Sequence, residues 1–197
     1  MNTTRIFSIV LFLVAAFLAV YLARLIYNDI EHTRRVEEVE AKVINQLKII
    51  REAQIAFQTV NGRFTADWDE LKAFIDTGKL FVIQKREEII PLDYGDDSVV
   101  LHIDTLDAVP VRDSLFSPLK YPNLDLSTLS YIPENEKGEQ FVIFAEKITK
   151  SGVSVDVIEV KDINPFDRTR KEDSDLRNRR PLRFGSRTDI TTAGNWE

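Results

Sequence analysis

The sequence contains no cysteine and only two histidines among its 197 residues. Without cysteine there is no disulfide, no thiol nucleophile and no cysteine-ligated metal. The two histidines, His32 and His102, are not spaced as metal ligands, and His102 falls in a segment with the alternation of a β-strand. The seven glycines stand singly, so there is no phosphate-binding loop and no G-x-S-x-G turn. We therefore expect a protein that is not an enzyme.

The chain also lacks an excess of positive charge, because its net charge is -6. A chain of this charge has no global field to attract nucleic acid, which we do not expect as a partner.

One acidic cluster, "DYGDDS", contains Asp93, Asp96 and Asp97. Calcium takes six to eight oxygen ligands, and carboxylates at this density can supply some of them. The spacing is not that of an EF-hand, and a hairpin turn rich in Asp and Gly is the ordinary alternative. Calcium is the one cofactor that the sequence leaves open.

Residues 6–27 form an apolar segment long enough to cross a membrane. Ile6 to Ala23 are 18 residues without a charge, and a helix needs about 20 residues to span the hydrocarbon core. A cleaved signal peptide is the alternative, but its apolar region usually has about 7–15 residues. We predict a short tail at 1–5 and a retained single-pass anchor in the lipid bilayer. Its marker residues are Ile6, Leu11, Phe17, Tyr21, Arg24 and Tyr27, the last three suited to the interface.

Basic residues flank the anchor on both sides, so counting them does not orient it. A very short N-terminal tail followed by a large domain is the common arrangement of an outward-facing protein. We therefore expect a bacterial inner membrane protein whose C-terminal domain is periplasmic or extracellular.

A soluble helix is predicted over 28–61, where apolar residues recur at heptad spacing. The seam residues are Val36, Val39, Val43, Ile50 and Phe57. This pattern is typical of a parallel coiled-coil homodimer. In the second half, however, Ile44, Leu47, Ile49 and Ile55 widen the apolar stripe, and a wide stripe favours packing against a folded domain. We expect the last three turns of this helix to lie on the domain's sheet.

The residues after the helix predict an α+β domain over 62–162. Asn61-Gly62 ends the first helix, and Asp67 with Glu70 forms a capping box for a short helix over 68–76. Strand patterns follow at 80–83, 89–90 and 99–106. The clearest hairpin joins 141–148 to 153–160, with a phase shift near Ile158 that indicates a bulge.

The remaining segment, 163–197, is strongly charged. Residues 167–183 include seven basic and four acidic side chains. A solvated loop is the ordinary interpretation, and a docking segment for an acidic partner or for lipid headgroups is the alternative. Four apolar residues in the ending are expected to pack back on the sheet: Leu182, Phe184, Ile190 and Trp196.

The stretch "AQIAFQTVNGRFTADWDEL", residues 53–71, resembles the junction of type IV pilins and type II secretion pseudopilins. In those proteins an Ala-rich helix end leads into an Asn-Gly-Arg-aromatic break, as Asn61, Gly62, Arg63 and Phe64 do here. The order of elements over 1–160 is also similar. The resemblance implies a pilin-like fold, with a membrane helix continuing into a long soluble helix and then a short helix packed with an antiparallel sheet.

The start of the chain departs from that family. The family signal is a glycine cleavage site, a phenylalanine and a glutamate four residues further on, whereas "MNTTRIFSIVLF" has no glycine and the first acidic residue is Asp29. We therefore do not expect processing by the prepilin peptidase or assembly as an ordinary filament subunit.

Together these features predict a single-pass, pilin-like scaffold or accessory subunit of a cell-envelope secretion or motility assembly, whose partners are other envelope proteins. One alternative is a coiled-coil dimeric spacer, or a structural protein of cell division or the cell wall. A sensor of an external ligand is a third class, which the lack of a signalling domain disfavours.

Overall fold

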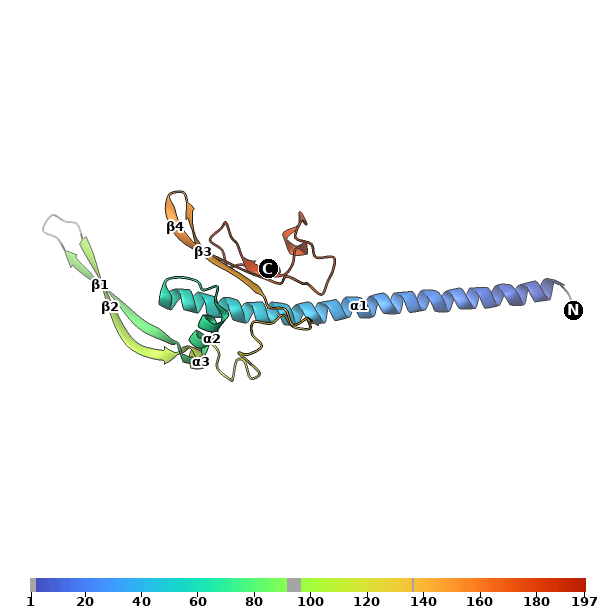
Figure 1. The fold of residues 1–197 in the computed structure, drawn as a ribbon, viewed down its shortest axis with the longest axis horizontal. Coiled ribbons are helices and arrows are strands. Elements are labelled where there is room, and N and C mark those ends of the chain that lie inside the picture. The colour runs from blue at the N-terminus through green and yellow to red at the C-terminus, as the bar shows by residue number, and fades with distance from the viewer. Residues whose placement is uncertain (1–2, 92–96, 136) are drawn as a thin grey trace. The chain divides into compact units, whose positions relative to one another are not determined.

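The computed structural model describes residues 3–91, 97–135 and 137–197. Side chains are not described at 3–6, 9, 82–85, 87–91 and 97–106. The chain divides into two compact units, Met1–Lys42 and Val43–Glu197. The fold is α+β, with a long apolar N-terminal helix and small antiparallel sheets (Figure 1).

The first element, α1, is a single α-helix of 59 residues, Thr3–Asn61. Within it, an 18-residue window reaches a mean hydropathy of 2.3, and none of that window is buried inside the protein. The anchor residues Leu11, Phe17, Tyr21 and Tyr27 are all more than half exposed. This part of the helix therefore has the length, composition and exposure of a single-pass membrane anchor.

The C-terminal turns of α1 carry a wide buried stripe. Val43, Ile50 and Phe57 from the seam are buried, but so are residues outside it: Leu47, Ile49, Gln54 and Ala56. Because these side chains are covered within one copy of the chain, the seam from Val43 onward is not open to a partner helix. The predicted packing against a folded domain is confirmed for these turns. Nearer the N-terminus, Val39 is buried and Val36 half-buried.

The predicted junction is confirmed. Gly62 has a φ of 70°, and its N–H donates to the Gln58 carbonyl at 2.8 Å, which ends α1 in the left-handed conformation that glycine adopts without strain. Arg63 lies over the Phe57 ring, with its guanidinium carbon 5.5 Å from the ring centroid, and its Nη2 is 2.5 Å from Glu70 Oε1. Phe64 is half-buried.

The second helix, α2, spans Trp68–Thr77. Asp67 caps it as expected, because its Oδ1 accepts from the Asp69 N–H at 2.8 Å. The predicted reciprocal bond from Glu70 is wrong: the Asp67 N–H donates to Thr65 Oγ1 instead, while the Glu70 carboxylate binds Arg63 and the Thr65 hydroxyl. Thr65 takes the place of Glu70 because its hydroxyl is only two residues from the N–H that needs an acceptor.

Helix α2 buries Leu71, Phe74 and Ile75, and Trp68 is half-buried. The Phe74 ring meets the Phe57 ring of α1 edge to face, with the centroids 5.1 Å apart. The helix also packs on α3, the single turn Val111–Ser114. The loop that follows α3 buries Phe116, Leu129 and Ile132.

Strands β1 (Lys79–Pro91) and β2 (Asp97–Pro110) form an antiparallel two-stranded ribbon. The two strand patterns predicted at 80–83 and 89–90 are parts of this one long strand β1. The register shifts between Val82 and Ile83. Within the described chain, no third strand pairs with the ribbon (Figure 1).

The second sheet has the order β3-β4-β5, built from Val142–Lys150, Val153–Lys161 and Arg183–Gly185. Ser151 and Gly152, with φ of 53° and 82°, make the hairpin turn between β3 and β4, as predicted. The bulge expected near Ile158 is wrong, because the β3–β4 register is continuous. The apolar run Val157, Ile158 and Val160 reflects the central position of β4, where both faces are buried.

The charged segment 163–197 belongs to this folded unit, since it supplies β5. Leu182 and Phe184 are buried as predicted, and Trp196 is half-buried. The prediction for Ile190 is wrong, because its side chain is 66% exposed in a turn that the polar side chains around it hold by themselves.

Candidate interaction groove on α1

An open groove lies along the C-terminal turns of α1, within the unit Val43–Glu197. It has a volume of about 510 Å³, within the size range of ligand-binding clefts. We call it the α1 groove; its lining residues are Lys48, Arg51, Glu52, Ile55, Ala56 and Thr59 of α1, Leu80 of β1, and Leu115 and Tyr121 of the loop after α3.

The floor of the groove is apolar. Ile55, Ala56, Leu80 and Leu115 provide it, and Ile55 remains 41% exposed. Ile55 is one of the residues that widen the stripe of α1 beyond the heptad seam. The seam residues beside it are buried in the domain, which leaves Ile55 at the border of the core.

The loop wall is held to α1 by Glu52. Lys120 Nζ lies 2.6 Å from Glu52 Oε1, and the Tyr121 hydroxyl donates to Glu52 Oε2 at 3.0 Å. The hydrogen bond to Glu52 raises the pKa of Lys120. Burial, followed by the hydrogen bond to Glu52, raises the pKa of Tyr121. Lys120 therefore stays charged and Tyr121 neutral at physiological pH, so this wall keeps its shape.

Arg51 ties the opposite rim to the end of the chain. Its Nη1 lies 2.6 Å from Glu197 Oε1 and donates to the Thr192 carbonyl at 3.3 Å. Its guanidinium carbon lies 5.9 Å from the centroid of the Trp196 ring. The hydrogen bond from Arg51 lowers the pKa of Glu197. Lys48, one turn before Glu52, is exposed on the same rim.

The exposed side chain of Leu119 lies in the wall loop, between Leu115 and Tyr121. It is 98% exposed, although it belongs to an ordered loop whose chain turns back through Lys120 and Tyr121 N–H bonds to the Ser117 carbonyl. The groove and its wall loop together offer apolar surface with a basic rim. Such a surface can bind an apolar segment of another molecule if that molecule also places a carboxylate near Lys48.

Of the other predicted site residues, the calcium candidates Asp93 and Asp96 lie outside the described residues, and only the backbone of Asp97 is described, as the first residue of β2. In the part of the chain that the structure does describe, no group of three His, Asp or Glu side chains is arranged to hold a metal ion.

The groove was not among the sites predicted from sequence. Its residues come from α1, from β1 and from the loop after α3, and local patterns do not bring these together. Two local features lie beside it: the widened stripe at Ile55, on which the predicted packing of α1 rests, and the proline-bounded stretch "SPLKYP" that contains Leu119, on which no prediction rests.

Comparison with protein-family models, with curated proteins and with solved structures finds no significant match for this chain.

Proposed function

We propose that this chain is a single-pass membrane protein of the bacterial inner membrane that works as a pilin-like scaffold or accessory subunit. It presents its folded unit on the periplasmic side and acts by protein–protein interaction in a secretion or motility assembly. The observation that carries the proposal is α1 itself. This one helix contains the exposed apolar segment in its first half and core residues of the folded unit in its second half.

The junction supports the same proposal. Gly62 ends α1 and Arg63 bridges Phe57 and Glu70, so the residues that resemble pilins fix the turn from the long helix to α2. The apolar segment 6–23 contains no acidic residue, and the lack of a glutamate within it favours an accessory role over a filament subunit. A coiled-coil spacer is less well supported, because Val43, Ile50 and Phe57 are buried within one copy.

The partner surface that we propose is the α1 groove, and its occupant is an apolar segment of another envelope protein with a carboxylate beside it. The apolar floor around Ile55 and Leu80 selects aliphatic or aromatic side chains. The carboxylate follows from charge complementarity with the exposed Lys48. Glu52 is paired with Lys120 and Arg51 with Glu197, whereas Lys48 interacts with Glu197 only through its electrostatic field.

Photocrosslinking in intact cells tests this proposal. A photoreactive phenylalanine analogue replaces Thr59, a groove residue with an exposed side chain, and a control chain carries it at Lys137, an exposed residue outside the groove. We expect one defined adduct with another envelope protein from position 59, identified by mass spectrometry. That adduct should be absent from position 137 and several-fold weaker when Lys48→Glu is added.

Two results would contradict the proposal. Identical adducts from both positions would show that the groove has no special role. An adduct of position 59 with a second copy of this chain alone would replace the hetero-partner with self-association and favour the dimeric spacer.

A further inference from the structure

The loop 163–180 combines exposed apolar and exposed basic side chains. Ile163 is 46% exposed, Phe166 42% and Leu176 63%. Four exposed basic residues accompany them: Arg168, Lys171, Arg177 and Arg179. The backbone N–H of Asp162 donates to the Leu182 carbonyl at 2.9 Å, so the two ends of this loop meet where β4 ends and β5 begins.

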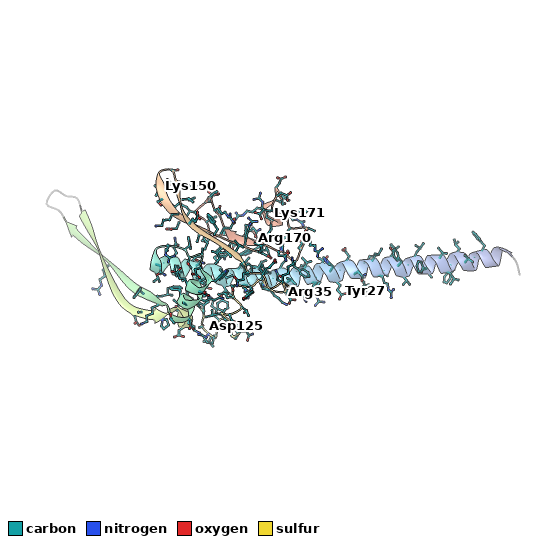
Figure 2. The ribbon with its side chains drawn as sticks, viewed as in Figure 1. Tyr27, Arg35, Asp125, Lys150, Arg170 and Lys171 are labelled. Carbon is teal, nitrogen blue, oxygen red and sulfur yellow. The ribbon has the colours of Figure 1, made fainter. Side chains whose placement is uncertain are left out.

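Internal contacts give the loop one shape. Arg170 Nη1 donates to the carbonyls of Asn178 and Arg180, at 2.7 and 3.0 Å. The buried Asn195 donates from its amide to the carbonyls of Arg177 and Arg180. Lys171 is joined to Arg179 through their backbones at 3.2 Å, and Figure 2 shows Arg170 and Lys171 side by side in this segment. A loop with fixed shape loses little entropy when it binds.

Two acidic residues of the loop have partners within the chain. Glu172 is held by Arg183, with Oε1 2.8 Å from Arg183 Nη1, and Asp167 accepts from the Thr169 N–H and hydroxyl. The bonds from Thr169 are neutral and leave Asp167 charged, so Asp167, Asp173 and Asp175 stand against the six basic side chains of residues 163–180. The loop is therefore locally cationic on a chain whose net charge is -6.

We propose that the loop 163–180 docks on a phospholipid surface with anionic headgroups. Arginine and lysine bind lipid phosphates, while Phe166 and Leu176 enter the boundary between headgroups and acyl chains. The inference rests on the proposed membrane anchoring, because only 15 residues separate Tyr27 from Val43 in the chain. That tether keeps the lipid at high effective concentration, so a modest cationic loop is sufficient.

A depth-quenching experiment on the full chain tests the docking. Because the protein has no cysteine, single cysteines can carry a fluorophore at chosen positions. The reporter is Asn178→Cys, exposed and between Leu176 and Arg179, in nanodiscs with a quencher lipid in the headgroup region. A second set of discs carries the quencher on the acyl chains, because a label in the middle of the anchor lies far from the headgroups. Two controls are Leu119→Cys, exposed on another loop, and Leu18→Cys within the anchor.

In discs with phosphatidylglycerol we expect several-fold stronger quenching at position 178 than at 119. This difference should disappear in pure phosphatidylcholine and at high salt, since exposed charges are screened. Leu176→Ser and Arg179→Glu should each reduce it, whereas the matched reversal Lys137→Glu should not.

The anchor label separates the two proposals. If the acyl-chain quencher quenches position 18 and the headgroup quencher does not quench position 178, in anionic discs, the docking inference is overturned while the anchoring stands. If the acyl-chain quencher does not quench position 18, the chain is not inserted and the proposed function itself fails. The inference is also contradicted if quenching at position 178 is the same in anionic and zwitterionic discs and is unchanged by Arg179→Glu.

Discussion

Replacing Gln54 with leucine should destabilise the folded unit more than its position in a helix suggests. Gln54 is fully buried, and its amide makes two hydrogen bonds with one residue of the loop after α1. Nε2 donates to the Thr65 carbonyl at 2.7 Å, and Oε1 accepts from the Thr65 N–H at 3.2 Å. Thr65 is itself only 1% exposed, so water cannot replace these bonds.

The magnitude follows from the two backbone groups that lose their partner. Each buried, unsatisfied polar group costs about 1–3 kcal/mol. Leucine offsets part of this loss, because it no longer requires a polar amide to be buried in the core. We expect a loss of about 3 kcal/mol from the free energy of unfolding. For a unit of this size this corresponds to a fall in Tm of roughly 6–12 °C.

Thermal and denaturant unfolding of the full chain in detergent measures this effect. The control is Gln58→Leu, the same change one turn later at a half-buried residue, for which we expect less than about 0.5 kcal/mol. Amide hydrogen exchange at Thr65 should also accelerate in the Gln54 variant. Equal losses for the two variants would refute the argument, because the cost would then come from helix propensity or volume.

Three further predictions concern the junction, the sheet and pH. Gly62→Ala should lower the free energy of unfolding by about 1 kcal/mol, because the φ of 70° is strained for alanine. No atom lies within 4 Å of the added Cβ, so this cost comes from the backbone alone. An unchanged free energy of unfolding would mean that the end of α1 relaxes freely. Arg183→Met should lower the free energy of unfolding by about 3 kcal/mol, since the Arg183 side chain, which is mostly buried, pairs with both Glu159 and Glu172. The control Lys150→Met, which removes an exposed pair with Asp189, should cost clearly less in the same assay. Hydrogen bonds from Arg183 and Arg51 lower the pKa values of Glu172 and Glu197 below the usual 4.5. The two ionised carboxylates therefore contribute fully to the free energy of unfolding above pH 4.5, and this contribution is lost as the pH falls through their pKa values in the folded protein. Unfolding free energies measured from neutral to acid pH should therefore fall less steeply for Glu172→Gln than for the unchanged chain, and parallel curves would contradict this.

Local signals in the sequence were sufficient for the long elements. The apolar run and the heptad pattern predicted α1, Asn61-Gly62 predicted its end, and Asp67 predicted the start of α2. The Ser151-Gly152 turn marked the β3–β4 hairpin. Each of these depends on residues within a few positions of one another.

The rest depends on contacts between distant segments. Nothing near Gln54 indicates that its amide satisfies Thr65, and nothing near Arg183 indicates a strand beside β4. Three predictions were wrong. The Glu70 bond failed because of a local competitor, Thr65, which lies only two residues from Asp67. The bulge near Ile158 and the burial of Ile190 failed because tertiary context decides them: β4 is the central strand of its sheet, and the side chain of Ile190 stays exposed.

The groove shows the same limit. In the sequence Glu52 is one of many charged residues of α1, yet it binds Lys120 and Tyr121 and so fixes the wall of the groove. Those residues lie far along the chain, so only the fold reveals their common site.

Thiol labelling in intact cells tests the central claim, a retained anchor with an outward-facing folded unit, most directly. Single cysteines replace Thr4 and Leu119 in this cysteine-free chain, and a membrane-impermeant maleimide is applied before and after cell lysis. The account predicts that the protein stays in the membrane after alkaline extraction, with position 119 labelled in intact cells and position 4 only after lysis. Release of a shortened protein by alkaline extraction, or labelling of position 119 only after lysis, would contradict it.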